Sequence, residues 1–144
     1  MKNSLYFLFF FLLASACAKK SSGTSETAAD EWPEMEAFHA IIAEAYHPFK
    51  DSANVAPAKE LAESLALEAD KWQAAPLPEK VNTEKVQSML VDLKTSARML
   101  SDQLKTGRTD EVVGALLTTV HDNFHKIMEA WYSSGKEKHE HGGS

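Results

Sequence analysis

The chain has 144 residues, of which 44% are hydrophobic and 25% are charged, and its formal net charge is −6. This composition is typical of a single globular domain with a short additional segment. Because the charge is negative and the Lys and Arg residues are not clustered, we expect no nucleic-acid partner. The single cysteine excludes an intramolecular disulfide, a CxxC redox pair, covalent CxxCH haem attachment and a multi-thiolate metal site.

Residues 1–16 have the pattern of an export signal peptide. A short basic start containing Lys2 is followed by an unbroken apolar run over 5–13 and by small residues at 14–16. The run is shorter than the roughly 20 apolar residues that a membrane-spanning helix needs. We therefore expect this segment to be removed by cleavage before Cys17.

The sequence Leu-Ala-Ser-Ala-Cys at 13–17 resembles the lipobox of bacterial lipoproteins, with the leucine one position earlier than in the family pattern. The resemblance implies that Cys17 carries lipid, palmitate included, and anchors the protein in the cell envelope. Ala18 in place of Asp implies sorting to the outer membrane, facing the periplasm or the surface. The polar segment completing 17–30 lacks periodicity and is predicted to be a flexible tether. The alternative for Cys17 is a free thiol.

The next two segments are predicted helices. The first extends from Trp32 to His47 and is expected to end at Pro48, followed by a loop over 48–54. Its core stripe is Met35, Phe38, Ile42, Ala45 and Phe49. The second begins at Pro57 and ends in the loop 75–78, with a stripe formed by Ala58, Leu61, Leu65, Ala69 and Trp72.

Two further helices complete the predicted domain. Asn82 is expected to cap the third, which ends at Gly107 and buries Val86, Met89 or Leu90, Leu93, Ala97, Leu100 and Leu104. The fourth begins at 109–111, ends at 133–135 and buries Val113, Leu117, Val120, Phe124, Ile127 and Trp131. Short connections predict an all-α, up-down-up-down four-helix bundle over 31–134. The charged tail 135–144, with His139 and His141, is expected to be disordered.

Four histidines lie on the first and fourth predicted helices: His39, His47, His121 and His125. At about 100° per residue, all four lie on the same-signed flank of their core stripes. Such flanks on antiparallel neighbours face each other in one of the two possible bundle hands. Because His121 and His125 are spaced i and i+4, they can chelate a transition metal. The pattern predicts a divalent metal, zinc or copper, bound by these four residues. The alternative is that they are boundary residues between core and solvent.

Two other hypotheses remain. The mature domain resembles four-helix cytochromes, in which a methionine near the start of the first helix and a histidine on the fourth hold b-type haem. That resemblance implies Met35 with His125, or His39 with His125, as haem ligands of an electron carrier. The other hypothesis is a ligand-free lipoprotein that supports the envelope or binds an envelope protein. We expect no enzyme, because no Ser-His-Asp set, phosphate loop or pair of buried carboxylates can be assembled.

Overall fold

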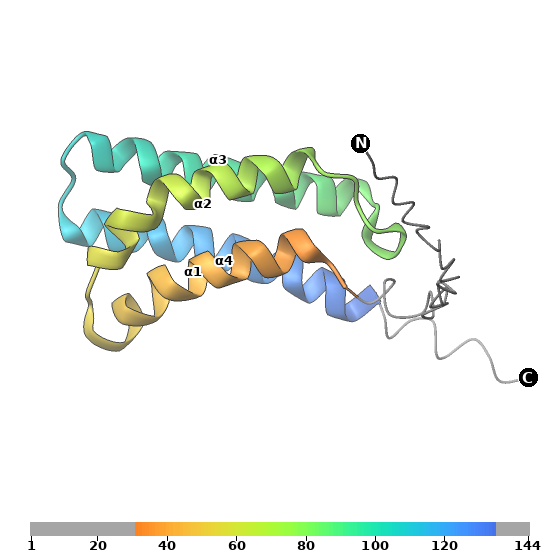
Figure 1. Cartoon of the computed structure of the whole chain (residues 1–144), viewed down its shortest axis with the longest axis horizontal. Helices are drawn as coiled ribbons and strands as arrows, with labels where there is room; N and C mark the ends of the chain where they lie inside the picture. Colours follow the sequence, from red (N-terminus) through yellow and green to blue (C-terminus); the bar gives the residue numbers. More distant parts are fainter. Residues whose placement is uncertain (1–30, 135–144) are drawn as a thin grey trace, which may run out of the picture.

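The computed structural model describes residues 31–134, and within this range it contains four α-helices, one short 3₁₀ helix and no strand (Figure 1). The elements are α1 (Pro33–Ser52), α2 (Ala56–Ala74), η1 (Glu79–Val81), α3 (Glu84–Lys105) and α4 (Asp110–Ser134). Each helix packs against the next, and α1 also packs against α4. The predicted all-α four-helix bundle is therefore confirmed. The predicted signal peptide, Cys17, the predicted tether and the tail histidines His139 and His141 lie outside the described residues.

The prediction that Pro48 ends the first helix is wrong, because α1 continues through Pro48 to Ser52. Proline has no N–H to donate, so one backbone hydrogen bond is lost, but its φ is compatible with a helix. The helix ends instead at Ala53, which is in the left-handed conformation with φ 55°. The Ala53 N–H donates to the Phe49 carbonyl at 2.7 Å, which closes the last turn. The extra turn places Phe49 and Lys50 on α1 instead of in a loop.

The N-terminal cap of α3 also differs from the prediction by one residue. Thr83, not Asn82, is the cap, and its hydroxyl accepts a hydrogen bond from the Val86 N–H at 3.2 Å. Asn82 instead follows the unpredicted η1 as its C-terminal cap, and its N–H donates to the Glu79 carbonyl. The Asn82 side chain instead accepts a hydrogen bond from the Gln87 amide.

Aromatic side chains make up the part of the core that packs beside the N-terminal half of α1. Phe38 lies between Trp72 and Phe124, with centroid separations of 5.7 Å to each, and Trp32 contacts Trp72 and Trp131 at 5.1 and 5.3 Å. Most residues of the four predicted stripes are buried. The exceptions, which are only partly buried, are Phe49, Leu61, Met89 and Leu104, while Leu90 takes the buried position next to Met89.

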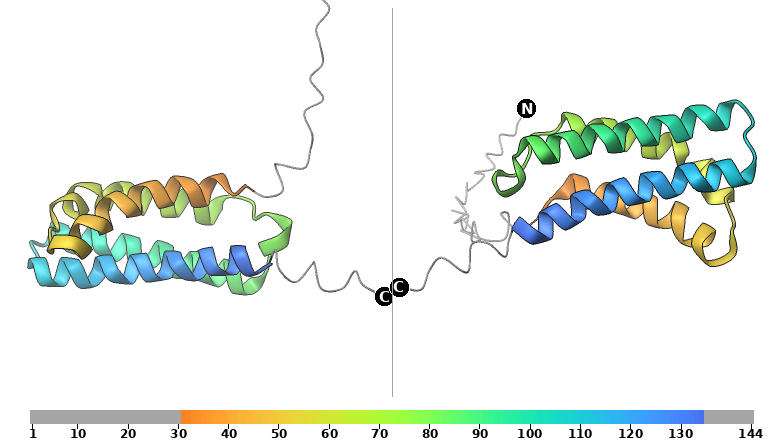
Figure 2. Two further views of the ribbon diagram at one scale, coloured as in Figure 1. Left: turned by 90° about the horizontal axis from the view of Figure 1, so that it is seen from below. Right: turned by 180° about the vertical axis from the view of Figure 1, so that it is seen from behind.

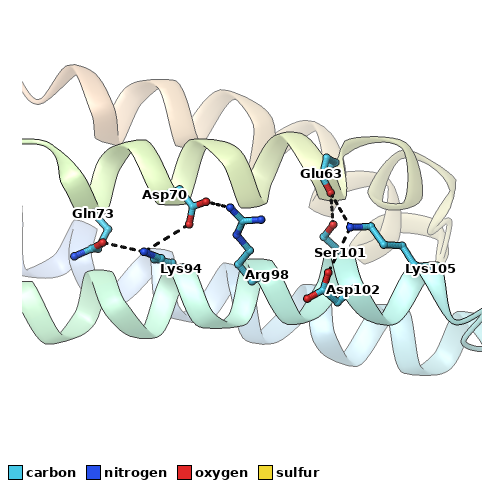
Figure 3. A network of polar contacts seen from close by, with 8 residues as sticks. All are labelled: Glu63, Asp70, Gln73, Lys94, Arg98, Ser101, Asp102 and Lys105. Carbon is cyan, nitrogen blue, oxygen red and sulfur yellow. Dashed lines mark hydrogen bonds and ion pairs between the residues drawn. The ribbon is translucent and has the colours of Figure 1, made fainter.

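The four seams of the bundle are not equivalent. A network of ion pairs and hydrogen bonds crosses from α2 to α3, as Figure 3 shows. In it, Asp70 pairs with Arg98, and Glu63 accepts a hydrogen bond from Ser101 at 2.6 Å and contacts Lys105 at 3.4 Å. Figure 2 shows α4 running beside α1, but these two helices share fewer contacts than the other adjacent pairs. The more loosely packed seam is the one that carries the histidines.

Candidate functional site: a histidine-lined groove between α1 and α4

A groove of about 330 Å³ opens along the seam between α1 and α4. All four histidines singled out from the sequence line it, two from each helix. The lining residues are His39, Ile42, Ala43, Tyr46, His47, Lys50, His121, Phe124 and His125. Aliphatic and aromatic side chains thus contribute apolar surface, and the imidazole nitrogens, the Tyr46 hydroxyl and the Lys50 ammonium group are the polar side-chain groups of the lining.

The two histidines of α4 form a close pair. Their Nε2 atoms are 3.0 Å apart, and their ring centroids are separated by 4.3 Å. Without a metal, one ring must donate an N–H and the other must accept it. Two imidazole nitrogens bound to one zinc ion, each about 2.0–2.1 Å from it at an angle of about 90–109°, lie about 2.9–3.4 Å apart. The pair therefore already has the nitrogen separation that a chelate requires.

Two of the four imidazoles, those of His121 and His39, stack on aromatic rings across the seam. The Tyr46 ring stacks on His121 with a centroid distance of 3.7 Å and an interplanar angle of 12°. A second stack also joins α1 to α4, between His39 and Phe124, with a centroid distance of 5.3 Å and an interplanar angle of 14°. Because stacked rings lose little rotamer freedom on binding, the stack on His121 preorganises its Nε2 atom toward the groove.

Burial is the main cause that lowers the pKa of His121, and the neighbouring His125 and the Lys50 ammonium lower it further, against the opposing effect of Asp122. The neutral imidazole, which is the form that binds a metal, is therefore favoured. The Nδ1 atom of His121 is buried and has no hydrogen-bond partner. The Asp122 carboxylate is 3.6 Å from it, which is longer than a hydrogen bond.

The histidines of α1 lie on the other wall and are more exposed. His39 and His47 are eight residues apart, which corresponds to about 12 Å along the helix axis. Across residues 31–134, no three His, Cys, Asp or Glu side chains are close enough to hold one ion. The arrangement is thus a close pair of imidazoles on α4 and two further imidazoles of α1 that line the same groove.

Met35 is placed elsewhere. It is buried in the core, 3% exposed, and does not line the groove that contains His125. The two residues implied by the cytochrome resemblance therefore do not share this cavity. His39, the other residue implied by that resemblance, does line it.

Sequence reasoning missed Tyr46 and Lys50 as groove residues. Both follow from His39 in helical steps, through Ala43 at i+4, Tyr46 at i+7 and Lys50 at i+11. The expectation that α1 ends at Pro48 hid Lys50, because it placed that residue in a loop.

No helix in the described range is both long enough and apolar enough to cross a membrane.

No protein-family model matches the chain, and neither a curated protein nor a solved structure is significantly similar to it. The groove between α1 and α4 is therefore the feature from which a function is inferred.

Proposed function

We propose that this protein is a cell-envelope lipoprotein that binds a divalent transition metal, zinc or copper, in the groove between α1 and α4. His121 and His125 provide the primary ligands, and either His39 or His47, which line the same groove, supplies a further imidazole. The observation that carries the proposal is the 3.0 Å separation of the two Nε2 atoms on α4.

The chemistry of the groove supports this assignment. Its potential ligands are imidazole nitrogens, which suit zinc and copper better than magnesium or calcium. The partly buried position of His121 lowers its pKa and so favours the neutral imidazole, which reduces the competition between protons and a metal. Metal-bound histidines usually donate their second ring nitrogen to a carboxylate or a carbonyl, and a small movement of Asp122 would provide this partner.

The haem alternative has less support from the packing. The aromatic side chains Phe38, Trp72 and Phe124 fill the centre of the bundle, and Met35 does not line the cavity beside His125. A ligand-free envelope protein is the second candidate, and it is favoured by the solvent-exposed positions of His39 and His47.

Calorimetric titration of the chain lacking its signal segment with Zn²⁺ and Cu²⁺ tests the proposal. We expect His121→Ala and His125→Ala each to weaken binding at least tenfold, because each removes half of the chelating pair. We expect His139→Ala, in the tail, to have little effect. Equal losses from the α4 and tail variants would show that the metal binds loosely to surface histidines. A visible haem spectrum in the purified protein would favour the electron-carrier hypothesis instead.

A further inference from the structure

The polar lining of the groove is cationic or neutral. Among residues 31–134, no carboxylate lines it, although the chain as a whole has a net charge of −6. Lys50 is part of the lining, and among residues 31–134 it makes no ion pair. A lysine in this position repels a free metal cation.

The proposed ligands do not neutralise a bound metal. Imidazoles bind as neutral groups, so a divalent ion would keep its two positive charges beside the Lys50 ammonium. The α4 pair fills two coordination positions. Since His39 and His47 are separated by about 12 Å along α1, one ion centred on the α4 pair is poorly placed to bind both. At least one coordination position would therefore face the open groove.

We propose that the physiological ligand of the groove is a metal complexed with a small anionic chelator that carries carboxylate groups. The α4 pair binds the metal, oxygen atoms of the chelator fill the remaining coordination positions, and a free carboxylate oxygen pairs with the Lys50 ammonium. The volume of about 330 Å³ is large compared with the roughly 30 Å³ share of one water molecule, so a small organic acid fits beside the ion. This inference rests on the proposed metal-binding function.

Two probes separate the metal from its complex: Ni²⁺ alone and the preformed 1:1 complex of Ni²⁺ with nitrilotriacetate. The complex carries three carboxylates and leaves two coordination positions free, which matches the α4 pair. All proteins in the test carry His139→Ala and His141→Ala, so that the tail does not contribute. The variant is Lys50→Gln, and the matched control is Lys85→Gln, an exposed lysine of α3 outside the groove.

We expect Lys50→Gln to change the two affinities in opposite directions. Binding of Ni²⁺ alone should become about two- to fivefold tighter because a repulsion is removed, and binding of the complex should become about two- to fivefold weaker because an ion pair is lost. Lys85→Gln should change neither affinity. If Ni²⁺ binds but Lys50→Gln leaves binding of the complex unchanged or tighter, the chelator inference is overturned and the metal site stands. If neither probe binds to the chain with an intact α4 pair, the proposed metal-binding function fails as well.

Discussion

At the scale of single residues, His121 shows how position changes the chemistry of a side chain. His125 is also a histidine and lies one turn further along α4. Of the two, His121 is the one whose ring is covered by Tyr46 and whose Nδ1 atom is buried without a hydrogen-bond partner. Burial disfavours the charged imidazolium, and an unpartnered buried nitrogen is costly unless a ligand compensates for it. A bound metal would fix the tautomer and draw Asp122 toward that nitrogen.

The N-terminal cap of α3 provides a test at one residue. Thr83→Ala should lower the free energy of unfolding by about 1 kcal/mol, because the Val86 N–H loses its acceptor. Asn82→Ala should have a smaller effect, since it removes only an exposed contact with Gln87. Urea denaturation of the two variants measures the difference. A larger loss for Asn82→Ala would contradict the assignment of the cap to Thr83.

Glu63 predicts a defined pH dependence of stability. The Ser101 hydroxyl, followed by Lys105, holds the pKa of the Glu63 carboxyl below its usual value of 4.5. The charged carboxylate is therefore favoured in the folded state, so its stabilising effect is present above that pH and is lost as the pH falls through the folded pKa. We expect the stability advantage of the native chain over Ser101→Ala to shrink between about pH 5 and pH 3.

Denaturant unfolding at several pH values measures this difference, and Ser88→Ala is the matched control, because Ser88 is an exposed serine of the same helix. An advantage over Ser101→Ala that stays constant down to pH 3 would show that the hydroxyl does not act on the ionised carboxylate.

At the scale of elements, the extra turn of α1 determines how that helix meets α4. The Phe49 ring lies over Gly114 so closely that a Cβ atom added at Gly114 would be 2.5 Å from the ring carbon Cε2. Glycine inside a helix lowers stability relative to alanine, and here it is required because the Phe49 side chain occupies that space.

Exchange at Gly114 tests this contact. We expect Gly114→Ala to destabilise the native chain by about 1 kcal/mol, because the ring must move. In a Phe49→Ala background the same substitution should stabilise the protein by about 1 kcal/mol, since alanine is the better helix former. Thermal or denaturant unfolding of the four proteins completes the double-mutant cycle. An identical effect in both backgrounds would mean that Phe49 does not pack on Gly114 in solution.

The α2–α3 and α1–α4 seams differ in the kind of contact that joins their helices. The α2–α3 seam is joined by ion pairs and hydrogen bonds, whereas the α1–α4 seam is joined mainly by stacked rings around a groove. Mixed charges along a seam help to specify which helices pair and in what register. The groove lined by the four histidines opens along the α1–α4 seam, where stacked rings take the place of such a network.

At the scale of the whole molecule, the proposed membrane anchor makes a direct prediction. Cys17→Ser should release the protein from the membrane fraction, because the lipid would have no site of attachment. Ser21→Ala, which leaves the cysteine intact, should remain bound. Fractionation followed by mass measurement of the mature N-terminus tests both variants. A Cys17→Ser protein that is cleaved yet still bound to membranes would refute lipid anchoring through this residue.

Hydrophobic periodicity was sufficient to predict the four helices and most of their buried residues. Leu117, Phe124 and Ile127, for example, are buried as their spacing requires, because a helix exposes one face to the core whatever its partner is. The errors are local. Continuation of α1 beyond Pro48 and the cap at Thr83 depend on backbone hydrogen bonds from neighbouring turns, which a pattern of residue types does not encode.

The candidate site, too, has features that follow from the sequence and features that depend on the tertiary structure. The sequence by itself determined which histidines lie on one flank of each helix, since that follows from about 100° of rotation per residue. Only the tertiary structure decided that these flanks border one groove, that the Nε2 atoms of His121 and His125 are 3.0 Å apart, and that Tyr46 and Lys50 join them. The reason is physical: helix periodicity specifies angles within one helix, whereas the hand of the bundle, the axial offset and the rotamers come from packing between helices.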